Sequence, residues 1–183
     1  MDYVKRQDIP EDDLRKIVSC VDFEAHTLKF MESDTIKDIL MGKREIIELL
    51  WNELEQRRER LKLAAAKYGH VQNASLEDVE CKVITLDLEK TQDSEYPSCK
   101  ILSILHSMHE GPRVSIGSHR DFITFRADGV PPFSFVNLME HLKEQFPHAL
   151  VSGGGHPNAG TVKFLPAAKD EIMREIRRYL RLS

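Results

Sequence analysis

The segment VSGGGHPNAGTV, residues 151–162, is the most informative part of this 183-residue chain. It contains three consecutive glycines, and glycine loses more conformational entropy on folding than any other residue while supplying no side chain to pack. Such a run is typical of a backbone that turns with positive φ, or of one that another group approaches closely. The flanking stretches, amphipathic at 134–146 and β-like at 160–165, predict a glycine loop between a helix and a strand.

The order of elements around the glycines excludes two familiar phosphate-binding motifs. The P-loop and the Rossmann turn place their glycines after a strand and before a helix, which is the reverse of the order here. A glycine-rich turn can still present successive N–H groups to an anion. His156 adds a hydrogen-bonding ring that gains a positive charge on protonation, and Asn158 adds a further donor. An equally good reading is a tight turn that needs only positive φ, with the histidine satisfied by nearby backbone.

The composition is that of a soluble globular protein with reduced thiols. Hydrophobic residues make up 41% of the chain, and the formal net charge is −4. No apolar run is long enough to span a membrane, and the N-terminus lacks the apolar core of a signal peptide. The three cysteines, Cys20, Cys81 and Cys99, are too widely spaced for a disulfide scaffold or a zinc site. We therefore expect a cytoplasmic protein, without a membrane partner and without a broad nucleic-acid-binding surface, although a local basic site is compatible with this charge.

The hydrophobic pattern divides the chain into a helical segment and an α/β domain. Helical spacing dominates up to about residue 70, and residues 42–67 are compatible with one long helix that Gly69 would cap. Strands and helices alternate after residue 75, which is typical of an α/β fold. We therefore expect a helical connector over 1–75 and an α/β domain over 76–183. Within that domain the pattern predicts strands at 81–88, 113–118, 121–128 and 160–165, and helices at 99–109, 134–146 and 169–182.

The glycine segment resembles a known family signature. Gly153-Gly154-Gly155-His156-Pro157-Asn158-Ala159 is similar to the GGGHxxA signature of the DHH-associated domain, the C-terminal substrate-binding module of DHH-superfamily phosphoesterases. That family includes RecJ-type exonucleases, oligoribonucleases that also dephosphorylate adenosine bisphosphate, and cyclic-dinucleotide phosphodiesterases. The resemblance implies an α/β domain with a mixed sheet. The family usually continues Ala-Ala-Gly, whereas Ala159 is followed here by Gly160, so the end of the loop is expected to differ in shape.

A second matching segment is ITFRADG, residues 123–129. It resembles the family strand whose arginine reaches toward the substrate phosphate or base, which makes Arg126 a second binding residue. A guanidinium is always charged and binds phosphate through two hydrogen bonds, although Arg126 could also be an ordinary surface arginine on a hairpin. His119 and Arg120 in the preceding turn are weaker candidates. Lys163 could line the same site, but strand alternation could equally point it away.

The residues that carry the family's chemistry are missing from this chain. In the family, an Asp-His-His triplet and further aspartates of a separate N-terminal domain bind two metal ions, usually manganese, that activate water. This sequence contains no Asp-His-His triplet. We therefore expect no catalytic residue and no metal site here, with Mn²⁺ bound only in a separate catalytic domain. The remaining polar clusters are interpreted as helix surface: Asp12, Asp13, Asp22, Glu24 and His26, and the pair His106 and His109.

The preferred hypothesis is a module that binds and positions a nucleotide or short oligonucleotide. Its substrate-binding residues would be Gly153, Gly154, Gly155, His156, Asn158 and Arg126. Hydrolysis would need a DHH catalytic domain supplied in cis or in trans. Two alternatives stay open. One is a stand-alone phosphoesterase with an unrecognised site. The other is a helical interaction protein that uses the helix at 42–67 to bind a replication or repair partner or to form a homodimer.

Overall fold

The computed structural model describes residues 10–27, 34–91 and 98–182. The chain divides into two compact units, Met1–Glu59 and Arg60–Ser183. The first unit is helical and the second contains the whole β-sheet.

The N-terminal unit contains α1 (Glu11–Thr27), α2 (Thr35–Leu40) and the first part of α3 (Arg44–Tyr68). Three acidic residues occupy the first turn of α1, where they interact favourably with the positive end of the helix dipole. Gly42 adopts φ +74° between α2 and α3, so it breaks the helical segment there. The buried residues that hold the unit together are Cys20, Phe23, Ile39, Ile47, Leu50 and Leu54.

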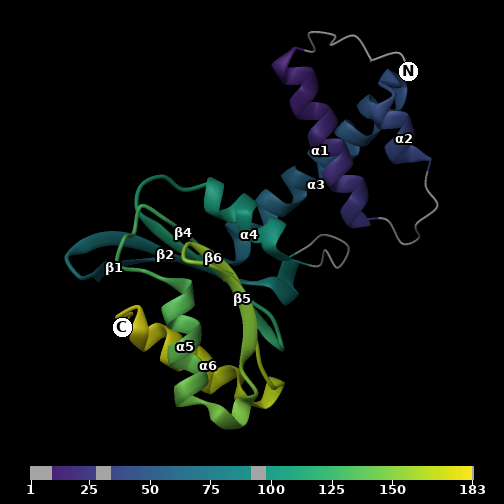
Figure 1. The fold of residues 1–183 in the computed structure, drawn as a ribbon. Coiled ribbons are helices and arrows are strands. Elements are labelled where there is room, and N and C mark those ends of the chain that lie inside the picture. Colours follow the sequence, from purple (N-terminus) through teal and green to yellow (C-terminus); the bar gives the residue numbers. More distant parts are fainter. Residues whose placement is uncertain (1–9, 28–33, 92–97, 183) are drawn as a thin grey trace, which may run out of the picture. The chain divides into compact units, whose positions relative to one another are not determined.

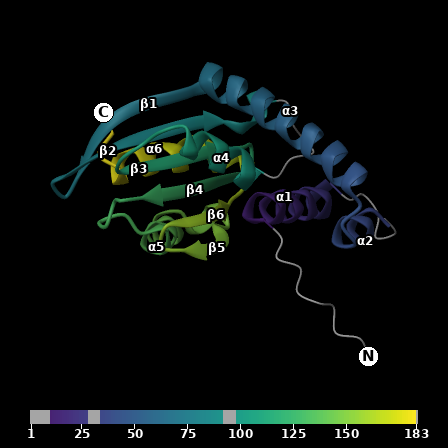
Figure 2. The same cartoon turned by 90° about the horizontal axis from the view of Figure 1, so that it is seen from above.

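The C-terminal unit is built on a mixed six-stranded sheet, as the α/β prediction required. The strands follow the order β1-β2-β3-β4-β6-β5, which Figure 2 displays side by side. Among the strands of the described residues only β2 and β3 run parallel, and the connection between them contains a short 3₁₀ helix (Leu88–Thr91) and α4 (Ser98–Ser107). The strands are β1 (Gly69–Leu76), β2 (Val79–Asp87), β3 (Arg113–Ser118), β4 (Phe122–Asp128), β5 (Ser152–His156) and β6 (Ala159–Lys163).

The first strand was not expected from the sequence. The long helix was predicted over 42–67 with Gly69 as its cap, inside a helical connector that ended at residue 75. α3 ends at Tyr68 as that helix required, but Gly69 begins β1, so residues 69–75 are not helical. A Cβ on Gly69 would lie 2.5 Å from the Ala65 carbonyl oxygen, so glycine permits this abrupt change from helix to strand. Most of β1 is exposed at the edge of the sheet, and it therefore lacks the apolar alternation that reveals a half-buried strand.

The two faces of the sheet carry different helices. On one face, α5 (Phe135–Gln145) and α6 (Lys169–Tyr179) cover a core formed by Val114, Ile116, Ile123, Phe125, Val162 and their helix partners. On the other face, α4 and the last turns of α3 cover Ile84 and Leu86 of β2. Figure 1 shows α4 on one side of the sheet and α5 and α6 on the other. α4 packs over β3 and β4. The same face of the sheet continues past α4 onto β6 and β5.

Candidate functional site

The three consecutive glycines form a strand and not the loop expected from the sequence. They lie in β5, which pairs with β6 in an antiparallel hairpin closed by Pro157 and Asn158. Among the three glycines only Gly153 has a positive φ, of +142°, so the backbone does not form the curled anion-binding turn considered above. Glycine has no side chain to show hydrophobic alternation, which is why the sequence pattern did not reveal this strand.

The glycines of the hairpin are present for different reasons. A Cβ on Gly153 would lie 2.1 Å from the Thr161 carbonyl oxygen, and one on Gly155 would lie 2.2 Å from that of Ala159. A Cβ on Gly160 would lie 2.0 Å from the ring of Phe135, the first residue of α5. Packing therefore requires glycine at these three positions. Gly154 differs, because an added Cβ would have no atom within 4 Å and the φ of this residue is not positive.

Strand register brings two of the predicted binding residues into one row. Arg126 of β4 pairs with Ala159 of β6, which in turn pairs with His156 of β5. Directly paired residues of antiparallel strands point to the same face. Neighbouring strands lie about 4.8 Å apart, so the Cα atoms of Arg126 and His156 are roughly 10 Å apart with only the small Ala159 between them. The row lies on the α4 side of the sheet, since the neighbouring β4 residues Phe125 and Ala127 enter the opposite core.

Two further rows continue this arrangement along the same three strands. Thr124, Thr161 and Gly154 form the middle row, and Phe122, Lys163 and Ser152 form the last one. We refer to these nine positions as the three-row face: Arg126, Ala159, His156, Thr124, Thr161, Gly154, Phe122, Lys163 and Ser152. The structure thus answers the question that alternation left open, because Lys163 shares the face of Arg126.

The three-row face carries basic groups and no carboxylate. His156 and Lys163 are exposed, and neither side chain forms a hydrogen bond or ion pair with another residue of the described part of the chain. Arg126 is exposed and donates from Nη1 to the Ser103 hydroxyl of α4. The middle row is neutral, with the Thr161 hydroxyl donating to Thr124 Oγ1 at 3.2 Å and Thr124 donating to the Gly160 carbonyl at 3.3 Å. Charge is therefore concentrated in the two outer rows.

The hairpin turn at the Arg126 end is held by its neighbours. Its backbone carbonyls accept hydrogen bonds, that of Asn158 from Ala127 N at 2.7 Å and that of Pro157 from Phe135 N at 2.8 Å. The turn is thus tied to β4 and to the start of α5. The side chain of Asn158 is exposed beside this row, so the predicted residues at the turn and on the two strands come together.

The weaker candidates His119 and Arg120 lie at the opposite end of the face. His119 Nδ1 is 2.9 Å from Asp121 Oδ1, and its ring stacks on Phe122 with 4.6 Å between the centroids. The hydrogen bond from His119 is the main cause that lowers the pKa of Asp121. This turn therefore adjoins the Lys163 row and lies away from Arg126 and His156.

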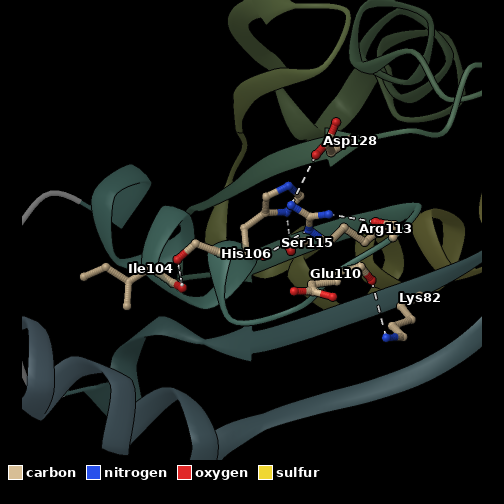
Figure 3. Close-up of polar contacts among 9 residues, drawn as sticks. Lys82, Ile104, His106, Glu110, Arg113, Ser115 and Asp128 are labelled. Atoms are coloured by element: carbon tan, nitrogen blue, oxygen red, sulfur yellow. Dashed lines mark hydrogen bonds and ion pairs between the residues drawn. The ribbon is translucent and has the colours of Figure 1, made fainter.

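His106 belongs to the interior, so its interpretation as a residue of the helix surface was wrong (Figure 3). Its Nδ1 lies 2.8 Å from the hydroxyl of the fully buried Ser115. Burial, followed by the charges of Arg113 and Arg126, lowers the pKa of His106 to about 4, so the ring is neutral near neutral pH. Arg113 donates to the His106 carbonyl at 3.0 Å and pairs with Asp128 at 3.2 Å. α4 ends at Ser107, so His109 is not one helical turn further along the same helix.

Neither a metal centre nor a membrane helix emerges from the described ranges. Over residues 10–27, 34–91 and 98–182, no three histidine, cysteine, aspartate or glutamate side chains are grouped so that they could hold a metal ion. That Mn²⁺ binds in a separate domain stays a prediction. None of the described helices combines the length and apolarity needed to cross a bilayer.

Comparison with known proteins relates this structure to DHH-domain proteins. No protein-family model matches the chain. The sequence is 27% identical over 194 residues to the uncharacterized protein MJ1198 of Methanocaldococcus jannaschii, an alignment that covers 93% of this chain and 25% of that protein. Among solved structures, the DHH domain of PF0399, described as a member of the s1p family of ribosomal proteins, matches with a TM-score of 0.81 and 28% identity. RecJ of Thermus thermophilus in complex with Mg²⁺ matches at a TM-score of 0.49 and 14% identity, over 92% of this chain and 25% of RecJ.

The match to the PF0399 DHH domain covers 95% of this chain and 43% of that one. The chain therefore spans about a quarter of the curated relative and less than half of the solved DHH-domain protein. The DHH-superfamily fold implied by the glycine-histidine signature is confirmed.

Proposed function

We propose that the three-row face binds the phosphate groups of a nucleotide or short oligonucleotide, as a substrate-binding module of a DHH-type phosphoesterase. The observation that carries this proposal is the row formed by Arg126, Ala159 and His156. It sets a guanidinium and an imidazole on one exposed face with only a methyl group between them.

The geometry of this row suits a single phosphate. Two long side chains whose Cα atoms are roughly 10 Å apart can reach opposite sides of one anion. Arg126 uses Nη1 for Ser103, which leaves further N–H groups of the guanidinium for a bidentate contact with phosphate oxygens. His156 has no partner among the described residues, so its ring is available as a second donor.

Gly154 and the free edge of β5 support close approach by a ligand. Since the fold does not require glycine at 154, its lack of a side chain leaves the strand backbone accessible on the face that carries Arg126 and His156. β5 is also an outer strand of the sheet as described, so its outward-pointing N–H groups have no strand partner there. Backbone N–H groups and basic side chains together are typical phosphate ligands.

We assign substrate binding and catalysis to different domains because of the residues that this chain contains. This chain would bind and orient the phosphoester, while a DHH catalytic domain in cis or in trans would supply the metal ions that activate the attacking water. The free thiols of Cys20, Cys81 and Cys99 support a cytoplasmic location for such a module.

Isothermal titration of the 183-residue chain with adenosine 3′,5′-bisphosphate and with short single-stranded oligonucleotides tests the proposal. We expect binding by the native protein, and a loss of about 1 to 3 kcal/mol in each of Arg126→Ala and His156→Ala, since each substitution removes charge-assisted hydrogen bonding to the phosphate. Lys143→Gln is the matched control, because Lys143 is an exposed lysine on α5, which covers the opposite face. Unchanged affinity in both alanine variants, with circular dichroism showing intact folds, would refute the role of this row.

Exposed apolar residues on the N-terminal unit favour a second function, helical association. Leu14 and Val18 lie one helical turn apart on α1 and are 48% and 58% exposed. Leu49 on α3 is also exposed. Sedimentation velocity over a range of concentrations, with Leu14→Ser/Val18→Ser as the comparison, would detect self-association. A monomer at every concentration would remove the homodimer from consideration.

A further inference from the structure

We propose that Lys163 forms a second phosphate subsite, which makes the three-row face selective for an oligonucleotide over a mononucleotide. This inference rests on the proposed function and adds a specificity-determining residue to it.

Register determines which way Lys163 points. It pairs with Phe122 of β4 and with Ser152 of β5, so it belongs to the third row of the same face as Arg126 and His156. It lies four positions after Ala159 on β6, which corresponds to roughly 13 Å along an extended strand. Side chains of a strand stand roughly perpendicular to the sheet, so the charged groups of the two outer rows are about as far apart as their Cα atoms, which is more than one phosphate spans. A ligand that uses both ends must therefore carry at least two phosphate groups, separated by sugar and base.

The charges around Lys163 leave its ammonium group available. Lys163 is exposed and has no ion-pair partner within the described residues. Asp121 lies near Lys163 in space, since the Asp121 carbonyl accepts a hydrogen bond from the N–H of the next residue, Phe164, at 3.0 Å. The carboxylate of Asp121 is held by His119 at 2.9 Å, so its charge is already partly compensated.

The surface between the two charged rows suits the neutral part of a nucleotide chain. Gly154 is exposed and Thr161 is partly exposed, whereas Thr124 is buried beside them. All three residues are small and uncharged, and the hydroxyl protons of both threonines are donated within the protein. A neutral strip of small residues between two cationic rows matches the alternation of sugar and phosphate along a single strand. Beyond Lys163, the ring of His119 stacks on Phe122 and leaves 38% of its side chain exposed, which offers a surface on which a base can stack.

The test compares a ligand with one phosphate and a ligand with several. Affinities of the full chain for AMP and for a single-stranded tetranucleotide are measured across a series of salt concentrations, for the native protein, Lys163→Gln, Arg126→Ala and the control Lys143→Gln. We expect Lys163→Gln to weaken tetranucleotide binding about tenfold, to reduce the slope of log K against log salt by about 0.7, and to leave AMP binding unchanged. Arg126→Ala should weaken binding of both ligands.

The outcomes separate this inference from the proposed function. If the native chain binds both ligands and Lys163→Gln changes neither affinity, or changes both equally, the second subsite is refuted while the Arg126 row stands. If the native chain binds neither ligand, the proposed function fails and the second subsite fails with it. A loss in Lys143→Gln equal to that in Lys163→Gln would show a general charge effect and would also overturn the inference.

Discussion

Gly154 and Gly155 are neighbours in one strand, yet the structure predicts opposite consequences for replacing them with alanine. Neither residue has a positive φ, so backbone strain does not distinguish them. The difference is steric. A Cβ at 155 would lie 2.2 Å from the Ala159 carbonyl oxygen and 2.4 Å from Gly160 Cα, whereas a Cβ at 154 would meet nothing within 4 Å.

The expected magnitudes follow from these distances. At 2.2 Å the new carbon is more than 1 Å short of the 3.4 Å at which ordinary contact begins, and both nearest atoms belong to the backbone of β6. β5 would have to move away from β6 and weaken the hydrogen bonds of the hairpin. Gly155→Ala should therefore cost about 2 to 3 kcal/mol of unfolding free energy. Gly154→Ala should be neutral or stabilising by up to about 1 kcal/mol, because alanine has less conformational freedom in the unfolded chain.

In a binding assay we expect Gly154→Ala to have an effect although it does not lower stability. The methyl group of Gly154→Ala would project from the middle row of the three-row face, so we expect it to weaken oligonucleotide binding several-fold without loss of stability. Urea unfolding followed by circular dichroism gives the stabilities, and titration with a tetranucleotide gives the affinities. The steric argument is refuted if Gly154→Ala destabilises the protein as much as Gly155→Ala does. The functional argument is refuted if Gly154→Ala leaves the affinity unchanged while Arg126→Ala reduces it.

Two further predictions concern stability. The pKa of His106 falls from 6.5 in the unfolded chain to about 4 in the folded one, so between these values the unfolded state binds more protons. The stability that His106 contributes is complete above pH 6.5 and declines by about 3 kcal/mol as the pH falls to 4, and urea titrations across this range should show a slope that His106→Gln lacks. Ser134 caps α5 by accepting a hydrogen bond from Asn137 N at 3.4 Å, so Ser134→Ala should lower the unfolding free energy by about 0.5 to 1 kcal/mol, and an unchanged urea midpoint would contradict this.

Local sequence patterns were sufficient for much of the α/β unit. The hairpin of β3 and β4 was predicted at 113–118 and 121–128, because alternating β-branched residues and a short polar turn encode it locally. The helix α5 was predicted from apolar residues at helical spacing behind Ser134. The glycine-histidine signature carried the family resemblance, since a side-chain pattern of seven adjacent residues needs no knowledge of tertiary contacts.

The two edge strands, β1 and β5, were not predicted from the sequence, and the physical reason is the same for both. β1 is polar and largely exposed, and β5 is mainly glycine, so neither has an apolar face that would reveal a period of two residues. Both become strands because a neighbouring strand offers hydrogen bonds to their backbone. For β5 this turned an expected loop into the outer strand of a hairpin.

Sequence by itself determined the residue types of the candidate site: Arg126, His156 and the glycines around it were identified from local motifs. Tertiary structure alone decided that Arg126 and His156 occupy one row, that Lys163 shares their face, and that Gly154 is the glycine which the fold does not need. The reason is that the facing of a strand residue depends on its register with segments far away in the chain. A shift of one residue would turn every side chain of that strand to the other face, and only long-range packing excludes it.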